Sequence, residues 1–130
     1  MMSKLMDQIC PKCEFKESGF SSGESYWSAQ SLYDQAEKEG ARAYVFPLKH
    51  FDFSVSVWGQ TERLTDLAYH FRRVLESDLS IPIIVGPLGN VLDGYHRIIK
   101  AVVTGEKVMA YRLIEMSEEN VDPEGDSADA

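Results

Sequence analysis

The sequence has few cysteines and no long hydrophobic run. Only two of its 130 residues are cysteines, so the chain has no second cysteine pair to complete a four-cysteine structural zinc site. No apolar stretch approaches the ~18 residues that a membrane-spanning helix needs, and the first residues lack the continuous apolar segment of a secretory signal. We therefore expect a cytoplasmic protein with no membrane partner.

Basic residues are also scarce, and charge is unevenly distributed. The chain has 13 Lys and Arg against 21 Asp and Glu, a net charge of −8. Residues 113–130 contain seven acidic residues and no basic one, whereas residues 41–112 carry a slight excess of basic residues. An acidic surface repels nucleic-acid phosphates, so DNA is a disfavoured partner. The basic middle of the chain still allows a site for a small anion.

The composition is otherwise that of one globular domain. Hydrophobic residues make up 44% of the chain and charged residues 26%, which excludes disorder throughout. We expect a flexible leader over residues 1–23, a folded domain over 24–114 and a disordered acidic tail over 115–130. The expected role of the tail is to aid solubility, with docking of a partner or mimicry of DNA as the alternative.

The first half of the domain predicts one helix and two extended segments. Ser25 or Ser28 can cap a helix that Gly40 ends. Residues 42–48 are typical of a strand, and apolar and polar residues alternate over 51–57, which indicates a second extended segment.

The clearest helix is predicted over residues 61–77, with Thr61 as its N-cap. Its apolar residues fall at helical spacing and are expected to form a buried face. These residues are Leu64, Leu67, Ala68, Phe71, Val74 and Leu75. Arg72 and Arg73 lie off that face, so we expect both to be solvated.

The second half predicts a hairpin, a helix and a final strand. Residues 81–85 form a short apolar run typical of a buried strand. A turn over 86–90 leads to extended structure at 91–92, a helix over about 94–104 and a strand over 107–114. The expected fold is a compact α/β (α+β) domain with a small mixed sheet and a helix that follows a β-hairpin.

The two cysteines, Cys10 and Cys13, are separated by two residues. This spacing suits half of a zinc site or a redox pair, but no strand precedes it as a thioredoxin-like motif requires. Only His50, His70 and His96 could complete a zinc site with nitrogen ligands. The favoured interpretation is a pair of exposed, reduced thiols in the leader, and zinc shared between two chains is the alternative.

Residues 93–101 carry the most informative pattern. Asp93 is expected to cap the helix that follows, and Gly94 allows a sharp bend and the close approach of a ligand. The free N–H groups and the positive end of the helix dipole then form a natural anion site. Lys100 lies one turn further along the same helix.

His96 and Arg97 fall in the first turn of this helix, where the dipole disfavours positive charge by a few tenths to ~1 kcal/mol each. A bound phosphate would remove this cost, because Arg97 can bind it with two hydrogen bonds and His96 can add another. We therefore expect a phosphate site. The alternative is a simple turn from strand to helix in which Arg97 pairs with a carboxylate of the protein.

The motif Asp93–Arg97 resembles the Asp-Gly-His-His-Arg-type signature of the ParB/sulfiredoxin-like domains. Residues 46–51 resemble the opening strand of those domains, and the helix 61–77 followed by residues 81–85 resembles their helix and apolar strand. The resemblance covers about residues 41–114. It implies a compact α/β fold that binds a nucleoside diphosphate or triphosphate, with or without Mg²⁺.

By this resemblance, Gly94, His96 and Arg97 would contact phosphates and Asp93 would shape the turn. The candidate nucleotide-binding residues are Asp93, Gly94, Tyr95, His96, Arg97 and Lys100. Sulfiredoxins have their catalytic cysteine where this chain has Tyr95, so sulfinic acid reduction is not expected. The chain ends soon after residue 114, so the clamp and centromere-binding functions of larger members are not expected either.

Two other functions stay open. Some members of the family are small-molecule kinases or nucleases, and such an enzyme would use a carboxylate to orient its nucleophile; Asp52 and Glu62 are the weak candidates. The third hypothesis is an interaction protein of phage or mobile-element origin that acts through its acidic tail. A homodimer is compatible with all three.

Overall fold

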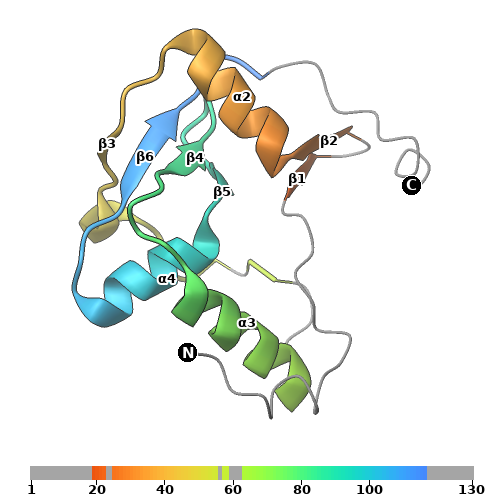
Figure 1. Cartoon of the computed structure of the whole chain (residues 1–130), viewed down its shortest axis with the longest axis vertical. Helices are drawn as coiled ribbons and strands as arrows, with labels where there is room; N and C mark the ends of the chain where they lie inside the picture. Colours follow the sequence, from red (N-terminus) through yellow and green to blue (C-terminus); the bar gives the residue numbers. More distant parts are fainter. Residues whose placement is uncertain (1–18, 23–24, 56, 59–62, 117–130) are drawn as a thin grey trace.

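A small four-stranded sheet forms the centre of the molecule (Figure 1). The computed structural model describes residues 19–22, 25–55, 57–58 and 63–116. The order of the strands is β3-β6-β4-β5, with the bounds Tyr44–Val45 for β3, Met109–Arg112 for β6, Ile83–Val85 for β4 and Val91–Asp93 for β5. β4 is parallel to β6 and antiparallel to β5, and β3 is antiparallel to β6. This mixed sheet confirms the expected α/β fold class.

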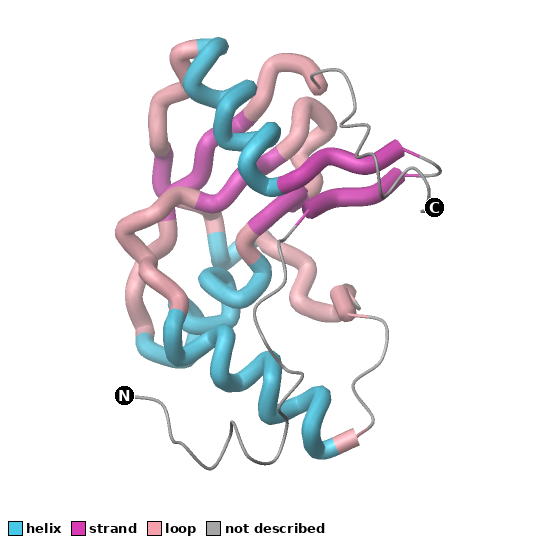
Figure 2. The backbone as a smooth tube through the Cα atoms, turned by 45° about the vertical axis from the view of Figure 1, so that its right-hand side comes forward, coloured by secondary structure: helices cyan, strands magenta, loops and turns pink. Residues whose placement is uncertain are grey.

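Helices cover both faces of β4. On one face, Ile83 and Val85 belong to a core cluster that includes Ile98 of α4 (Tyr95–Thr104). On the other face, Ile84 packs in a cluster with Leu32 of α2 (Ala29–Glu39). Figure 2 shows the strands between these helices. The structure confirms a buried strand for Ile83–Val85, the last three residues of the predicted run 81–85, whereas Ile81 is 47% exposed. A strand covered on both faces has no polar side, which is why its sequence is continuously apolar.

A β-hairpin precedes α2. Its strands are β1 (Gly19–Ser22) and β2 (Ser25–Ser28), which pair antiparallel. The predicted flexible leader over residues 1–23 is therefore wrong for Gly19–Ser22, which form β1. The hairpin is anchored by Phe20 and Trp27, which pack against the α2 side of the sheet.

The predicted ends of α2 and α4 are confirmed. Ser28 is the N-cap of α2, and its Oγ accepts a hydrogen bond of 3.1 Å from the Ser31 N–H. Gly40 and Gly105 end the two helices with φ of 69° and 76°, a left-handed conformation that glycine adopts without steric cost. The helix α4 follows the β4–β5 hairpin and provides the crossover that the parallel pair β4 and β6 requires.

The chain between β3 and the next helix is less regular than its sequence indicates. The predicted strand over 42–48 shortens to β3, and the chain turns into the 3₁₀ helix η1 (Leu48–His50). Among the described members of 51–57, none forms a strand. Asp52 accepts hydrogen bonds from the backbone N–H and the hydroxyl of Ser54, and such a local turn competes with strand pairing.

The helix α3 (Leu64–Glu76) forms within the predicted range 61–77, but its N-cap is Arg63 rather than the predicted Thr61, and its expected buried face is wrong. No residue of α3 is fully buried, and the side chains of Leu64, Phe71 and Leu75 are 83%, 64% and 67% exposed. The helix packs against α4 rather than on the sheet (Figure 1), so only part of its apolar face is covered. No helix within the described part of the chain is long and apolar enough to cross a membrane.

We predict that Gly94→Ala destabilises the fold by about 2–4 kcal/mol. Gly94 has φ 124°, and an added Cβ would lie 2.3 Å from Cγ2 of Ile83 in β4. Urea unfolding measures the change in free energy. The matched control is Gly105→Ala, where φ is 76° and no atom lies within 4 Å of the new Cβ, so only about 1 kcal/mol of backbone strain is expected. Equal losses in the two variants would contradict the role of Ile83.

Candidate functional site

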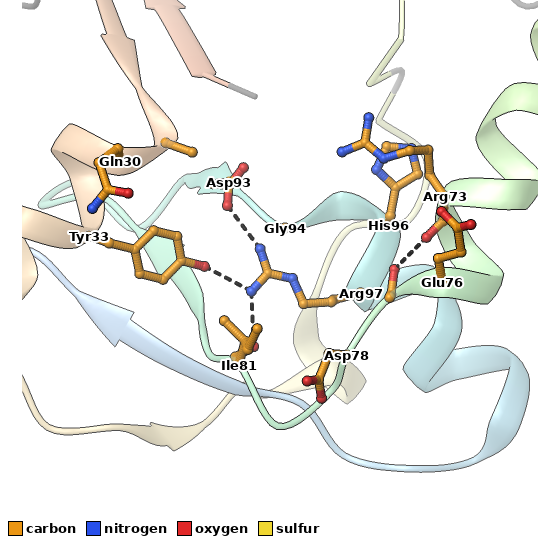
Figure 3. A pocket seen from close by; sticks show the side chains of 12 residues that line it. Gln30, Tyr33, Arg73, Glu76, Asp78, Ile81, Asp93, Gly94, His96 and Arg97 are labelled. Atoms are coloured by element: carbon orange, nitrogen blue, oxygen red, sulfur yellow. Dashed lines mark hydrogen bonds and ion pairs between the residues drawn. The ribbon is translucent and has the colours of Figure 1, made fainter. Parts of the chain in front are cut away.

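A pocket of about 460 Å³ lies where the starts of α2 and α4 meet the end of α3 (Figure 3). Its volume is within the range of small-molecule sites. It is lined by Ala29, Gln30, Tyr33, Arg73, Glu76, Ser77, Asp78, Ile81, Asp93, Gly94, His96 and Arg97. The pocket thus contains four of the six predicted nucleotide-binding residues. Tyr95 and Lys100 are not among the lining residues.

Arg97 is bound by the protein itself. Its Nη2 donates a 2.8 Å hydrogen bond to Oδ2 of Asp93, and the two side chains are only 15% and 11% exposed. Its Nη1 donates to the Tyr33 hydroxyl at 2.8 Å and to the carbonyl oxygens of Ile81 and Pro82 at 2.9 Å. The alternative in which Arg97 pairs with a carboxylate of the protein is therefore the observed arrangement. Most of its donors are directed at protein atoms rather than at the open pocket (Figure 3).

Asp93 and Gly94 also have roles that differ from those predicted. Asp93 does not cap α4, because its carboxylate is directed at Arg97 and the N-cap is Gly94, with no side-chain cap. The close approach that requires a glycine is that of Ile83 rather than of a ligand. The first hydrogen bond of the helix runs from the Ile98 N–H to the Gly94 carbonyl. The helix itself therefore does not satisfy the N–H groups of residues 95–97.

Lys100 and Tyr95 serve the packing of the fold. The Nζ of Lys100 donates to the carbonyl oxygens of Leu75 and Ser77 at 3.1 and 2.6 Å. This places a positive charge at the carbonyl end of α3, where the helix dipole favours it. Tyr95 packs against the core beside Phe51, and burial raises the pKa of its hydroxyl. The prediction that Lys100 belongs to an anion cradle is wrong.

His96 forms a stacked group with His70 of α3 and Trp58. The Trp58 ring lies 3.9 Å from the His70 ring and 4.7 Å from the His96 ring, measured between centroids. His70 Nδ1 and His96 Nε2 are 3.0 Å apart. Burial lowers the pKa of His96 to about 4, and Arg73, His70 and Arg97 add to this effect. His96 is therefore neutral at pH 7, which corrects its prediction as a cation.

Arg73 is the functional candidate that the sequence analysis missed. It lines the pocket, donates a 2.8 Å hydrogen bond to the Tyr69 hydroxyl and lies over the Tyr69 ring. Its charge lowers the pKa of both His70 and His96, and Figure 3 shows its side chain beside that of His96. The signal was present in the sequence, because Arg73 follows His70 by three positions and so shares its helix face.

Two further carboxylates line the pocket and have partners of their own. Glu76 forms an ion pair with Arg72 at 3.4 Å. Asp78 accepts hydrogen bonds from the backbone N–H and hydroxyl of Ser80, which lower the pKa of its carboxyl. These groups occupy the α3 side of the pocket, opposite the start of α2 (Figure 3).

The remaining candidates do not lie in this pocket or cannot be placed. Asp52 is exposed and does not line the pocket, and Ser54 lowers the pKa of its carboxyl. Glu62, Cys10 and Cys13 lie outside the described residues. Within the described ranges, no group of three or more His, Cys, Asp or Glu side chains could hold a metal ion.

Comparisons with known proteins give no relative for this chain. No family model matches it, and neither the curated proteins nor the solved structures show a significant match. The resemblance of residues 41–114 to the ParB/sulfiredoxin-like domains therefore stays a prediction. The function has to be argued from the pocket itself.

We predict that Arg97→Ala lowers the free energy of unfolding by about 3 kcal/mol, because it leaves the buried Asp93 carboxylate without its partner. Urea unfolding measures this loss. The control is Arg63→Ala, which breaks an exposed pair with Asp66 in which the Arg63 side chain is 81% exposed and should cost under about 1 kcal/mol. An Arg97 variant as stable as the wild type would show that the Asp93 pair does not support the fold.

Proposed function

We propose that the pocket binds the phosphate group of a nucleoside phosphate. The observation that carries this proposal is that the N-termini of two helices meet at one pocket that also contains Arg73. Each helix N-terminus acts as about half a positive charge and presents N–H donors. An anion between them would interact with both dipoles and with a full positive charge.

The start of α2 contributes backbone donors. Ala29 and Gln30 are its first two residues, and both line the pocket. The Ser28 side chain accepts from the Ser31 N–H, one position further along the helix, so this cap does not use the amides of the first two residues. The Gln30 side chain is engaged with Asp34 at 2.9 Å, which leaves the backbone as the main donor on this side.

The start of α4 contributes the second set of donors. The N–H groups of residues 95–97 precede the first hydrogen bond of the helix, and Gly94 and His96 line the pocket. His96 is neutral, so it adds a hydrogen-bonding ring rather than a charge. This arrangement keeps the anion site that the sequence predicted but changes the residues that form it.

Arg73 takes the role that the sequence analysis gave to Arg97. A guanidinium can bind a phosphate with two parallel hydrogen bonds. The guanidinium of Arg97 donates its hydrogen bonds to Asp93, Tyr33 and two carbonyl groups. Arg97 therefore has a structural role in the lining of the pocket. Arg73 reaches the pocket from α3.

The other lining groups suit the rest of a nucleotide. Tyr33 and Ile81 provide an aromatic and an aliphatic surface for the sugar or base. Mg²⁺ is commonly held by one or two carboxylates together with substrate phosphates. Glu76 and Asp78 line the pocket and would have to exchange their contacts with Arg72 and Ser80 for the metal ion. The proposal is limited to binding, because Asp52 does not line the pocket and Glu62 lies outside the described residues.

We predict that Arg73→Gln raises the Kd for a nucleoside phosphate at least about tenfold, because it removes a charge-assisted hydrogen bond. Calorimetric titration with ATP, CTP and ADP in the presence of Mg²⁺ measures the affinity. The matched control is Arg63→Gln, which removes the same charge from the exposed start of α3. Absence of binding by the wild-type chain, or equal losses in the two variants, would refute the proposal.

A further inference from the structure

Two imidazole rings share a hydrogen bond beside the pocket. His70 Nδ1 on α3 and His96 Nε2 on α4 are 3.0 Å apart, although the residues are separated by 26 positions in the sequence. The two rings are within 19° of being parallel, and Trp58 stacks on both of them. His96 lines the pocket, whereas His70 is not among the lining residues. A ligand in the pocket therefore meets His96 directly and His70 through it.

The hydrogen bond restricts where the hydrogens of the pair can lie. Each neutral imidazole carries one hydrogen on one of its two nitrogens. Because one hydrogen lies between the rings, the second can be on only one of the two outer nitrogens, His96 Nδ1 or His70 Nε2. Neither outer nitrogen has a hydrogen bond to a described residue. The neutral pair therefore has a hydrogen-bond donor at one end and an acceptor at the other.

Neighbouring charges favour one of these two arrangements. Burial and the charge of Arg73 lower the pKa of His70, and the charge of Asp66, one turn earlier on α3, raises it. Because His70 Nδ1 faces His96, Nε2 is the nitrogen of His70 that carries the hydrogen favoured by Asp66. His96 Nε2 then donates to His70 Nδ1, and His96 Nδ1 has no hydrogen. In the free protein, the ring that lines the pocket thus offers an acceptor, which does not suit an ionised phosphate oxygen.

One added proton changes the acceptor into a donor. When a proton from the solvent binds to His96 Nδ1, this nitrogen can donate a hydrogen bond to a phosphate oxygen. The hydrogen between the rings moves from His96 Nε2 to His70 Nδ1 at the same time. The positive charge then lies on His70, near Asp66, and His96 remains a neutral ring. Only N–H bonds form and break in this step.

The charges around the pair make this proton uptake depend on the ligand. Burial lowers the pKa of His96 to about 4, and Arg73, His70 and Arg97 add to this effect. Arg97 is already paired with Asp93, whereas a phosphate group bound beside Arg73 would oppose the positive charge of that residue. The added proton is therefore favoured while the anion is bound. The other ionisable groups that contact the pair or line the pocket are Tyr33, Tyr69, Glu76, Asp78 and Asp93.

We propose that the chain takes up one proton through His96 and His70 when the pocket binds a phosphate group, so that its affinity for the anion rises as the pH falls. This inference rests on the proposed phosphate binding and adds His70 as a positioning residue behind His96. Uptake of one proton on binding lowers the Kd by up to about tenfold for each unit by which the pH falls.

The test is calorimetric titration of the full chain with ATP, CTP and ADP between about pH 5.5 and 8, in buffers that differ in their enthalpy of ionisation. His70→Gln keeps a hydrogen-bonding group beside His96 but cannot hold the charge, so it should bind with fewer protons taken up and a flatter pH profile than the wild type. The matched control is His50→Gln in η1, which should keep the wild-type profile. The protons that the nucleotide itself exchanges are the same in all three chains.

Nitrogen NMR of the wild type needs no variant and so tests the pair even if His70→Gln fails to fold. At pH 7, His96 Nδ1 should lack a hydrogen in the free chain and gain one when the nucleotide is added. Binding with no more proton uptake than in His70→Gln would overturn this inference and leave the proposed binding intact, whereas absence of binding would overturn both. A hydrogen already present on His96 Nδ1 in the free chain would overturn the inference whether or not a nucleotide binds.

Discussion

The pairing of Arg97 with Asp93 is the interaction on which the pocket depends. One guanidinium joins the end of β5, the first turn of α4, the segment that leads into β4 and, through Tyr33, the helix α2. Both charged side chains are largely buried, so removal of either would leave an uncompensated charge in a poorly solvated place. The two helix N-termini that form the pocket are held together by this contact. The positive charge of Arg97, which in the sequence indicated a bound anion, thus stabilises the fold of the protein itself.

The sequence predicted best those features that depend on local chemistry. The Ser28 cap, the helix ends at Gly40 and Gly105 and the buried strand β4 are all correct, because a cap, a left-handed glycine and an uninterrupted apolar run have few alternatives. The extended segment after β3 is wrong because Asp52 folds back on its own backbone. Alternation of apolar and polar residues cannot reveal such a turn.

The sequence predicted where the candidate site lies but not which residues form it. A cationic side chain near a helix N-terminus looks the same in sequence whether its partner is a ligand or a carboxylate four residues earlier. The role of Lys100 depends on how α3 crosses α4, which is a tertiary feature without a local signal, whereas the position of Arg73 on the His70 face of α3 could be read from the sequence. The same crossing explains why Phe71 stays exposed, since α3 rests on another helix and not on the sheet. The motif residues predicted the position of the pocket, but the role of each of these residues depends on its tertiary contacts.

The close contact between Gly94 and Ile83 has a consequence for how this chain could evolve. An added Cβ at position 94 would meet both Cγ2 and Cβ of Ile83, at 2.3 and 2.6 Å, so trimming the isoleucine to valine or alanine would not make room for it. A side chain could enter at 94 only after position 83 had lost its own or the backbone had shifted. The two positions are therefore epistatic, and divergence at one is constrained by the other although they lie in different elements.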